Sequence, residues 1–310
     1  MRFIQQARLG KNDWWRYLGT LVLVFLGWQF FGVIPLFIVA MQKAGSMDEM
    51  MMHADNVFVD LGIDSNLYLF CMIFTFFVGL LGLLIGLKFL HKRSLSSLIT
   101  ARPGMDWSRF FFGFGFWLTM SVALMGVDYM MHPDDFVFQL QWKPFLILLV
   151  VALFFLPFQT SFEELLFRGY LMQGTALLTS RPWVPLLLTS IVFGLMHGLN
   201  PEVEKLGNVV LLYYIGTGLL FGLITILDEG TELALGMHFA NNFAAAIFVT
   251  MDWTVFQTDA LFKDISEPDL SWEMFLPVFV IYPLVLLYFS KKYQWGSWKE
   301  KILTKATLNP

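Results

Sequence analysis

Residues 145–171 read FLILLVVALFFLPFQTSFEELLFRGYL, an apolar stretch that contains two glutamates and one arginine. A helix needs about 20 mostly apolar residues to cross the hydrocarbon core of a bilayer, so this stretch predicts a membrane-spanning helix. Each charged side chain inside such a helix costs about 2.5–3.5 kcal/mol, and it is retained where it has a partner or a function. The stretch therefore predicts both a membrane protein and a polar site within it.

The composition of the whole chain agrees with this prediction. Of the 310 residues, 57% are hydrophobic and 14% are charged, whereas a soluble domain carries about 25% charged residues. So little charge cannot cover a water-facing surface, which excludes a disordered chain, a coiled coil and a disulfide-bonded scaffold. The net charge of −4 argues against nucleic acid as a partner, and the single cysteine, Cys71, permits no internal disulfide.

Eight apolar stretches are recognisable along the chain. Because they are continuous and separated by polar segments, we predict an all-α fold: a polytopic membrane helix bundle with about eight transmembrane helices. The stretch at 183–199 is short for a spanning helix, and the one at 145–171 contains charges. The eight stretches are residues 18–41, 67–90, 110–131, 145–171, 183–199, 206–227, 233–251 and 274–290.

The basic residues predict the orientation of this bundle. If the N-terminus is cytoplasmic, most of the 20 basic residues fall in inside segments, and the positive-inside rule then places both termini in the cytoplasm. Residues 46–66 and 253–272 are predicted to be acidic connections on the outside. Residues 291–310 are basic and contain Trp295 and Trp298, which predicts an interfacial anchor. The outside loops hold only Lys43, Lys143, Lys205 and Lys263.

Polar residues occur in three of the predicted spans, and helical spacing assigns them different tasks. Glu164 and Arg168 are four residues apart and can form an ion pair. Glu163 is turned about 100° around the helix and has no obvious local partner. The three motifs are Glu163-Glu164-Leu165-Leu166-Phe167-Arg168, Phe193-Gly194-Leu195-Met196-His197 and His238-Phe239-Ala240-Asn241-Asn242.

These groups can meet if the fourth and fifth spans form a hairpin with its turn at residues 180–182. Equal helix rise on both sides of that turn would place Glu163 and His197 at the same depth, provided that the fourth helix continues beyond Tyr170. His238 and Asn242 share a helix face and enter the membrane from the cytoplasmic side. We therefore expect the four groups to line one cavity that opens inward.

Such a set of side chains allows two kinds of hydrolysis. In the first, Glu163 takes a proton from a water that His197 also positions, while His238 and Asn242 donate to the oxyanion of a tetrahedral intermediate. In the second, Glu163, His197 and His238 hold zinc or another divalent metal, which activates the water. The sequence leaves both mechanisms open.

The three motifs, in this order and in apolar helices, resemble those of the CPBP family of intramembrane proteases. This family includes the type II CAAX prenyl endopeptidases and the Abi bacteriocin-immunity proteins, and its pattern is EExxxR, then FxxxH, then HxxxN. The resemblance covers about residues 145–250 and implies an intramembrane endopeptidase, a hydrolase that cuts a membrane-associated substrate. The implied catalytic residues are Glu163, His197, His238 and Asn242, supported by Glu164, Arg168 and Phe193.

The resemblance also organises the chain and its surroundings. Residues 1–140 would form transmembrane helices one to three, residues 141–255 the CPBP-like catalytic core, and residues 256–310 an outside loop, the eighth helix and a basic cytoplasmic tail. The implied partners are a membrane-anchored peptide or protein and the bilayer itself, in a bacterial cytoplasmic membrane. The alternatives are a non-catalytic immunity or scaffolding protein of the same fold, and a transporter, although internal repeats typical of transporters are not apparent.

Overall fold

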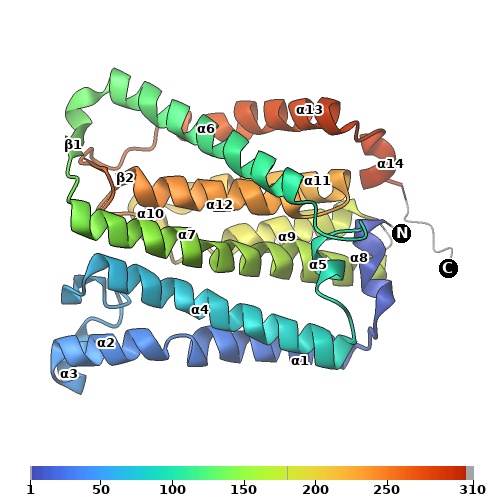
Figure 1. Ribbon diagram of the computed structural model, residues 1–310, viewed down its shortest axis with the longest axis horizontal. Helices are drawn as coiled ribbons and strands as arrows, with labels where there is room; N and C mark the ends of the chain where they lie inside the picture. Colours follow the sequence, from blue (N-terminus) through green and yellow to red (C-terminus); the bar gives the residue numbers. More distant parts are fainter. Residues whose placement is uncertain (1, 180, 305–310) are drawn as a thin grey trace.

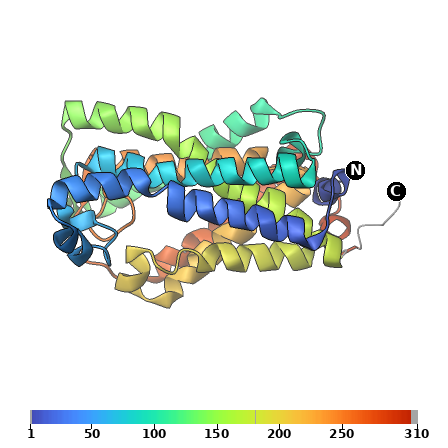
Figure 2. The same cartoon turned by 90° about the horizontal axis from the view of Figure 1, so that it is seen from below.

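The computed structural model describes residues 2–179 and 181–304 as a bundle of helices that lie side by side (Figures 1 and 2). The predicted all-α membrane bundle is confirmed. Within the described residues, six helices are long and apolar enough to cross a membrane, and two shorter helices, α9 (Trp183–Leu195) and α12 (Glu232–Ile247), match the other predicted spans. The six are Trp14–Ala44, Ser65–His91, Trp107–Met131, Trp142–Thr179, Asn208–Asp228 and Trp272–Tyr293.

The elements follow one another along the bundle in chain order. The N-terminal part comprises η1 (Phe3–Leu9), α1 (Trp14–Leu26), η2 (Gly27–Phe31), α2 (Ile34–Ala44), α3 (Met47–Met52), η3 (Val59–Leu61), α4 (Ser65–Ile85), η4 (Gly86–His91), α5 (Ser96–Ile99), α6 (Trp107–Met131) and η5 (Pro133–Asp135). The C-terminal part comprises α7 (Trp142–Glu164), η6 (Leu165–Leu171), α8 (Met172–Thr179), α9, α10 (Pro201–Leu206), η7 (Asn208–Val210), α11 (Leu211–Asp228), α12, η8 (Trp272–Phe275), η9 (Pro277–Ile281), α13 (Tyr282–Tyr293) and α14 (Trp298–Ile302).

The fourth span continues past the polar motif, as predicted. Pro157 lies inside α7 without ending it, and a π-helical segment, η6, begins directly after Glu164 and leads into α8. Local π-helical turns are rare and often accompany functional sites. Of the predicted turn at 180–182, Ser180 lies outside the described residues.

Helix α12 is the central helix of the bundle and runs between α6 and α7 (Figure 1). Nearly all of its side chains are buried, so a helix of 16 residues can sit within the bundle because its neighbours shield it from lipid. Gly236 permits the close approach of α6, since a Cβ atom there would lie 2.1 Å from the carbonyl oxygen of Phe110. The burial of α12 removes His238 and Asn242 from contact with lipid.

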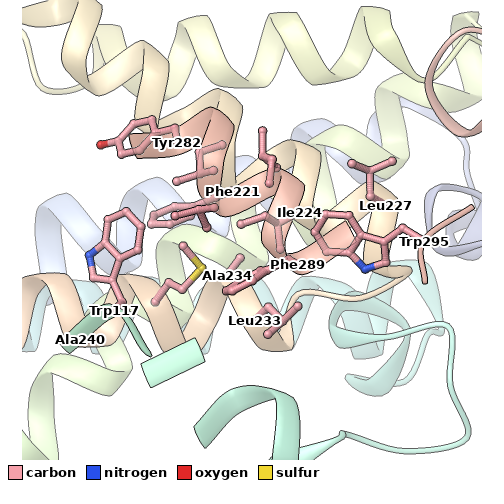
Figure 3. Close-up of a cluster of buried hydrophobic side chains, with 14 residues drawn as sticks. Trp117, Phe221, Ile224, Leu227, Leu233, Ala234, Ala240, Tyr282, Phe289 and Trp295 are labelled. Carbon is pink, nitrogen blue, oxygen red and sulfur yellow. The ribbon is translucent and has the colours of Figure 1, made fainter. Parts of the chain in front are cut away.

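A cluster of large apolar side chains joins α6, α11, α12 and α13 (Figure 3). Trp117 and Trp295 lie at opposite ends of this cluster, and each is 4% exposed. The prediction that Trp295 anchors the chain at the membrane interface is therefore wrong. Its indole ring is buried, and Nε1 donates to Asp228 at 2.8 Å, because a buried indole requires an acceptor.

The two ends of the bundle differ. At one end, here called the basic end, η1 and α14 lie beside the turn between α11 and α12, and the guanidinium of Arg2 donates to the carbonyl of Lys301 (Figure 1). The positive-inside rule predicts that this end is cytoplasmic.

The opposite end carries a small sheet of order β1-β3-β2. Strand β1 (Phe136–Phe138) pairs antiparallel with β3 (Phe262–Asp264), and β2 (Val249–Thr250) pairs parallel with β3. The segment 253–272, predicted as a solvated loop, thus contributes a strand. Strands of two or three residues are too short to show the alternation that marks a strand in sequence.

Candidate active site

Glu164 is the centre of the buried polar cluster. Its side chain is fully buried, and Oε1 accepts a hydrogen bond from Nη1 of Arg168 at 2.8 Å, which confirms the predicted ion pair. The same oxygen lies 2.8 Å from Nδ1 of His238 on α12. A carboxylate only accepts, so Nδ1 of His238 carries the proton and Nε2 faces away from Glu164. Glu164 therefore fixes both the arginine and the orientation of the imidazole.

Nε2 of His238 faces the other glutamate. It lies 3.7 Å from Oε2 of Glu163, a distance beyond a direct hydrogen bond but one that a water can bridge. Glu163 is 8% exposed, and its Oε1 accepts from Nε2 of Gln159 at 3.3 Å. The prediction that Glu163 lacks a local partner is thus corrected: Gln159, one turn earlier, provides a weak one.

Arg168 ties three helices together. Its guanidinium is 1% exposed, donates from Nη2 to the carbonyl of Gly218 on α11 at 3.2 Å, and lies 4.3 Å above the ring of Phe193 on α9. A Cβ atom at Gly218 would lie 3.0 Å from the carbonyl oxygen of Ser190, so the glycine allows α9 and α11 to pack closely. The cation thus holds the walls of the site as well as neutralising Glu164.

His197 lies just beyond the end of α9. Its Nδ1 is 2.8 Å from the carbonyl of Phe193, an acceptor that requires a proton on Nδ1 and leaves a lone pair on Nε2. The ring of Phe193 contacts the imidazole at 4.8 Å, as predicted, and Tyr214 of α11 stacks on it at 4.1 Å with an interplanar angle of 18°. Two aromatic rings therefore hold His197 in place.

The structure brings the predicted residues together only in part. In the part of the chain that it describes, no hydrogen bond or ion pair joins His197 to Glu163, and Phe193 contacts both imidazoles, at 4.8 Å for His197 and 6.2 Å for His238. Glu163 and His238 face each other directly. The expectation of equal depth for Glu163 and His197 does not bring their side chains into contact.

Asn242 lies one turn after His238 on α12 and is 8% exposed. Its Oδ1 accepts from Nδ2 of Asn241 at 3.2 Å, which leaves its own Nδ2 as a donor. Phe221 stacks on His238 at 5.3 Å. The buried face of α12 thus presents an imidazole and an amide donor on successive turns.

The predicted metal ligands were tested against the same geometry. Among residues 2–179 and 181–304, no group of three or more histidine, cysteine, aspartate and glutamate side chains is arranged to hold a metal ion. Of Glu163, His197 and His238, only the first and the third approach each other. The donor set does not fit a metal in this arrangement, and no step below passes through one.

Several residues of the site were not found from the sequence. Tyr214 and Phe221 flank the two imidazoles, and Glu202 on α10 accepts hydrogen bonds from the hydroxyl of Tyr214 and, at 3.1 Å, from Asn200. A signal was present, because Tyr214, Gly218 and Phe221 follow the spacing of one helix face. Nothing in the sequence indicated that this face is turned toward the histidines.

Comparisons with known proteins agree with the position of the site. Residues 142–244 match the profile of the family described as "Type II CAAX prenyl endopeptidase Rce1-like", and this range contains all three motifs. The chain is also similar to the uncharacterized protein YyaK of Bacillus subtilis (strain 168), with 29% identity over 293 residues, 91% of this chain and 94% of YyaK. No solved structure matches the chain.

Proposed function

Because residues 142–244 belong to the Rce1-like type II CAAX prenyl endopeptidases, a family of membrane proteases, we propose that this integral membrane protein is an intramembrane endopeptidase. It hydrolyses a peptide bond of a membrane-associated peptide or protein. The observation that carries the proposal is the contrast between two adjacent carboxylates. Glu164 is neutralised by Arg168, whereas Glu163 faces the 3.7 Å gap to His238 with only an amide as its hydrogen-bond donor.

The gap between Glu163 and His238 suits the attacking water. Glu163 takes one proton from this water, while Nε2 of His238, held by the bond of Nδ1 to Glu164, fixes the position of the water. The oxygen then bonds to the carbonyl carbon of the substrate, and the carbon–nitrogen bond breaks as Glu163 returns the proton to the leaving amine. This assigns to His238 the water-positioning role that the sequence suggested for His197.

The remaining polar groups act on the substrate. Nδ2 of Asn242 donates to the carbonyl oxygen as negative charge develops on it, in a site from which water is largely excluded. His197 has no partner for Nε2 among the described residues, and this lone pair accepts from a peptide N–H of the substrate. Arg168 and Glu164 do not react but keep the imidazole of His238 in register.

Replacement of Glu163 by glutamine tests the proposal. The variant keeps the shape and the bond to Gln159 but cannot take a proton, so cleavage of a membrane-anchored peptide in proteoliposomes should fall about 1,000-fold. The exposed Glu204 of α10, replaced by glutamine, is the control and should cleave at the unaltered rate. Full cleavage by E163Q, with E204Q also active, would contradict the proposal.

A chelator distinguishes the water mechanism from its metal alternative. Because no step needs a metal, cleavage should persist after treatment with EDTA. Loss of cleavage that zinc restores would overturn the metal-free mechanism while leaving the protease assignment intact. A scaffolding or immunity protein of this fold would instead show no cleavage, and its E163Q variant would keep its partner function.

We further propose that the protein resides in the cytoplasmic membrane of a bacterium with the basic end inside. The similarity to the Bacillus subtilis protein and the distribution of basic residues support this location. Labelling of single cysteines introduced in η5 and in α14 would test it, since only the latter should be protected in intact cells.

A further inference from the structure

A chain of hydrogen bonds runs from α6 into the candidate active site. The indole Nε1 of Trp117 donates to Oδ1 of Asn241 at 3.2 Å, and Nδ2 of Asn241 donates to Oδ1 of Asn242 at 3.2 Å. An indole N–H can only donate, whereas a side-chain amide has one end that donates and one that accepts. Trp117 therefore fixes the direction of the whole chain.

The direction matters at its last member. Since Asn241 must turn its oxygen toward Trp117, its amino group faces Asn242, which in turn must present its oxygen to Asn241. Nδ2 of Asn242 is then left to donate. The flipped amide has nearly the same shape but would present an oxygen instead, which repels a developing oxyanion.

We propose that Trp117 and Asn241 are positioning residues that orient Asn242 as the oxyanion donor of the reaction. This inference rests on the proposed function and extends it to the N-terminal helices. Trp117 lies outside residues 142–244, which match the protease family, so the match alone does not reveal this contribution. It also gives Asn241 a task beyond joining two helices.

Packing alone would also retain a tryptophan at this position, so a matched control is needed. Trp117 contacts Phe221 at 6.4 Å and Tyr282 at 5.9 Å in the apolar cluster. Trp295 is equally buried in the same cluster and also donates its N–H to a polar acceptor, Asp228, but at the opposite end (Figure 3). Replacing either residue with phenylalanine removes an indole N–H from the same core.

The experiment is a double-mutant cycle with kcat and KM measured for cleavage of a membrane-anchored peptide. Asn242→Ala removes the donor and should lower kcat about 100-fold, whereas Trp117→Phe only frees the amide to flip and should lower kcat about tenfold, with KM unaltered. In the Asn242→Ala background, Trp117→Phe should cause no further loss, since its effect passes through the amide. Trp295→Phe should lower the melting temperature and leave kcat of the folded protein within twofold.

Two results would overturn this inference while the proposed function stands. One is an equal loss of kcat from Trp117→Phe with and without Asn242, and the other is an equal loss from Trp295→Phe. Should Trp117→Phe fail to fold, Asn241→Leu in the same cycle replaces it and must also lose its effect in the Asn242→Ala background. Full cleavage by E163Q would instead refute the proposed function itself, so the two failures are distinguishable.

Discussion

The protein contains two buried clusters of charged side chains, and they differ in the ratio of carboxylates to arginines. At the basic end, Arg102 contacts Asp228 at 2.8 Å and Glu232 at 3.1 Å, and Arg109 contacts Asp228 at 2.9 Å. In the candidate active site, Glu163 and Glu164 share the single Arg168, which bonds only to Glu164. The first cluster, here called the end network, balances its charge, whereas the second leaves one carboxylate over.

Hydrogen bonding follows the same division. Both oxygens of Asp228 have donors, from Trp295 and from the two arginines. In the active site, Oε2 of Glu164 is buried without a hydrogen-bond partner. Buried polar atoms are nearly always satisfied, and exceptions concentrate at sites where chemistry or an unseen water uses them. The comparison teaches that the end network serves the fold and that the incomplete cluster serves the reaction.

The largest expected effect comes from removing the one cation of the active site. Arg168→Met leaves two carboxylates buried without a counterion, so the free energy of unfolding should fall by about 3–5 kcal/mol and cleavage should cease. Thermal unfolding in detergent measures the loss. Lys291→Met, at an exposed position of α13, is the control and should change stability by less than about 0.5 kcal/mol. An unchanged melting temperature for Arg168→Met would show that the cluster does not depend on its arginine.

Breaking the end network should affect stability but not chemistry. Asp228→Asn removes the charge shared by Arg102 and Arg109, yet both arginines are partly exposed and can turn to water. We expect a loss of about 1–3 kcal/mol, with kcat of the folded fraction unaltered. A drop in kcat comparable to that of E163Q would erase the distinction between the two clusters.

The sequence predicted the active-site ion pair because its partners belong to one helix. Glu164 and Arg168 are four residues apart, and helical geometry alone brings them together. The spans were predicted equally well, since continuous apolar runs are a local signal. The family resemblance selected Glu163 and His238 from the polar residues of these runs.

The contacts between distant segments could not be predicted in this way. The turn at 228–232 has no basic residue, and Arg102 and Arg109 reach it from a segment more than 100 residues earlier. Likewise, the stacking of Tyr214 on His197 depends on how α9 and α11 rotate against each other. Helix rotation is set by packing at glycines such as Gly218, which the sequence shows without revealing what approaches them.

A smaller effect is expected at the ring that holds His197. Tyr214→Leu removes the stacking contact at 4.1 Å, and aromatic pairs contribute about 0.5–1.5 kcal/mol, so kcat should fall up to about tenfold. Tyr214→Phe keeps the ring and loses only the bond to Glu202, and it should retain most of kcat. Equal losses in the two variants would show that the hydroxyl, and not the ring, positions His197.

The smallest effect is expected where the end network meets water. Asp106 caps the N-terminus of α6, and hydrogen bonds from Ser108 and Arg109 lower its pKa to about 2. Asp106→Ala should therefore cost about 1 kcal/mol of unfolding free energy at pH 7. Because the folded pKa is depressed, this contribution is present above the unfolded value of about 3.9 and disappears as the pH falls through about 2. Melting temperatures of the two proteins should converge at that pH, whereas Asp134→Ala, at an exposed position, should match the parent protein at pH 7. A difference that persisted below pH 2 would mean that the cap acts through its shape and not its charge, and the boundary between charged network and solvated surface would then lie deeper in the bundle.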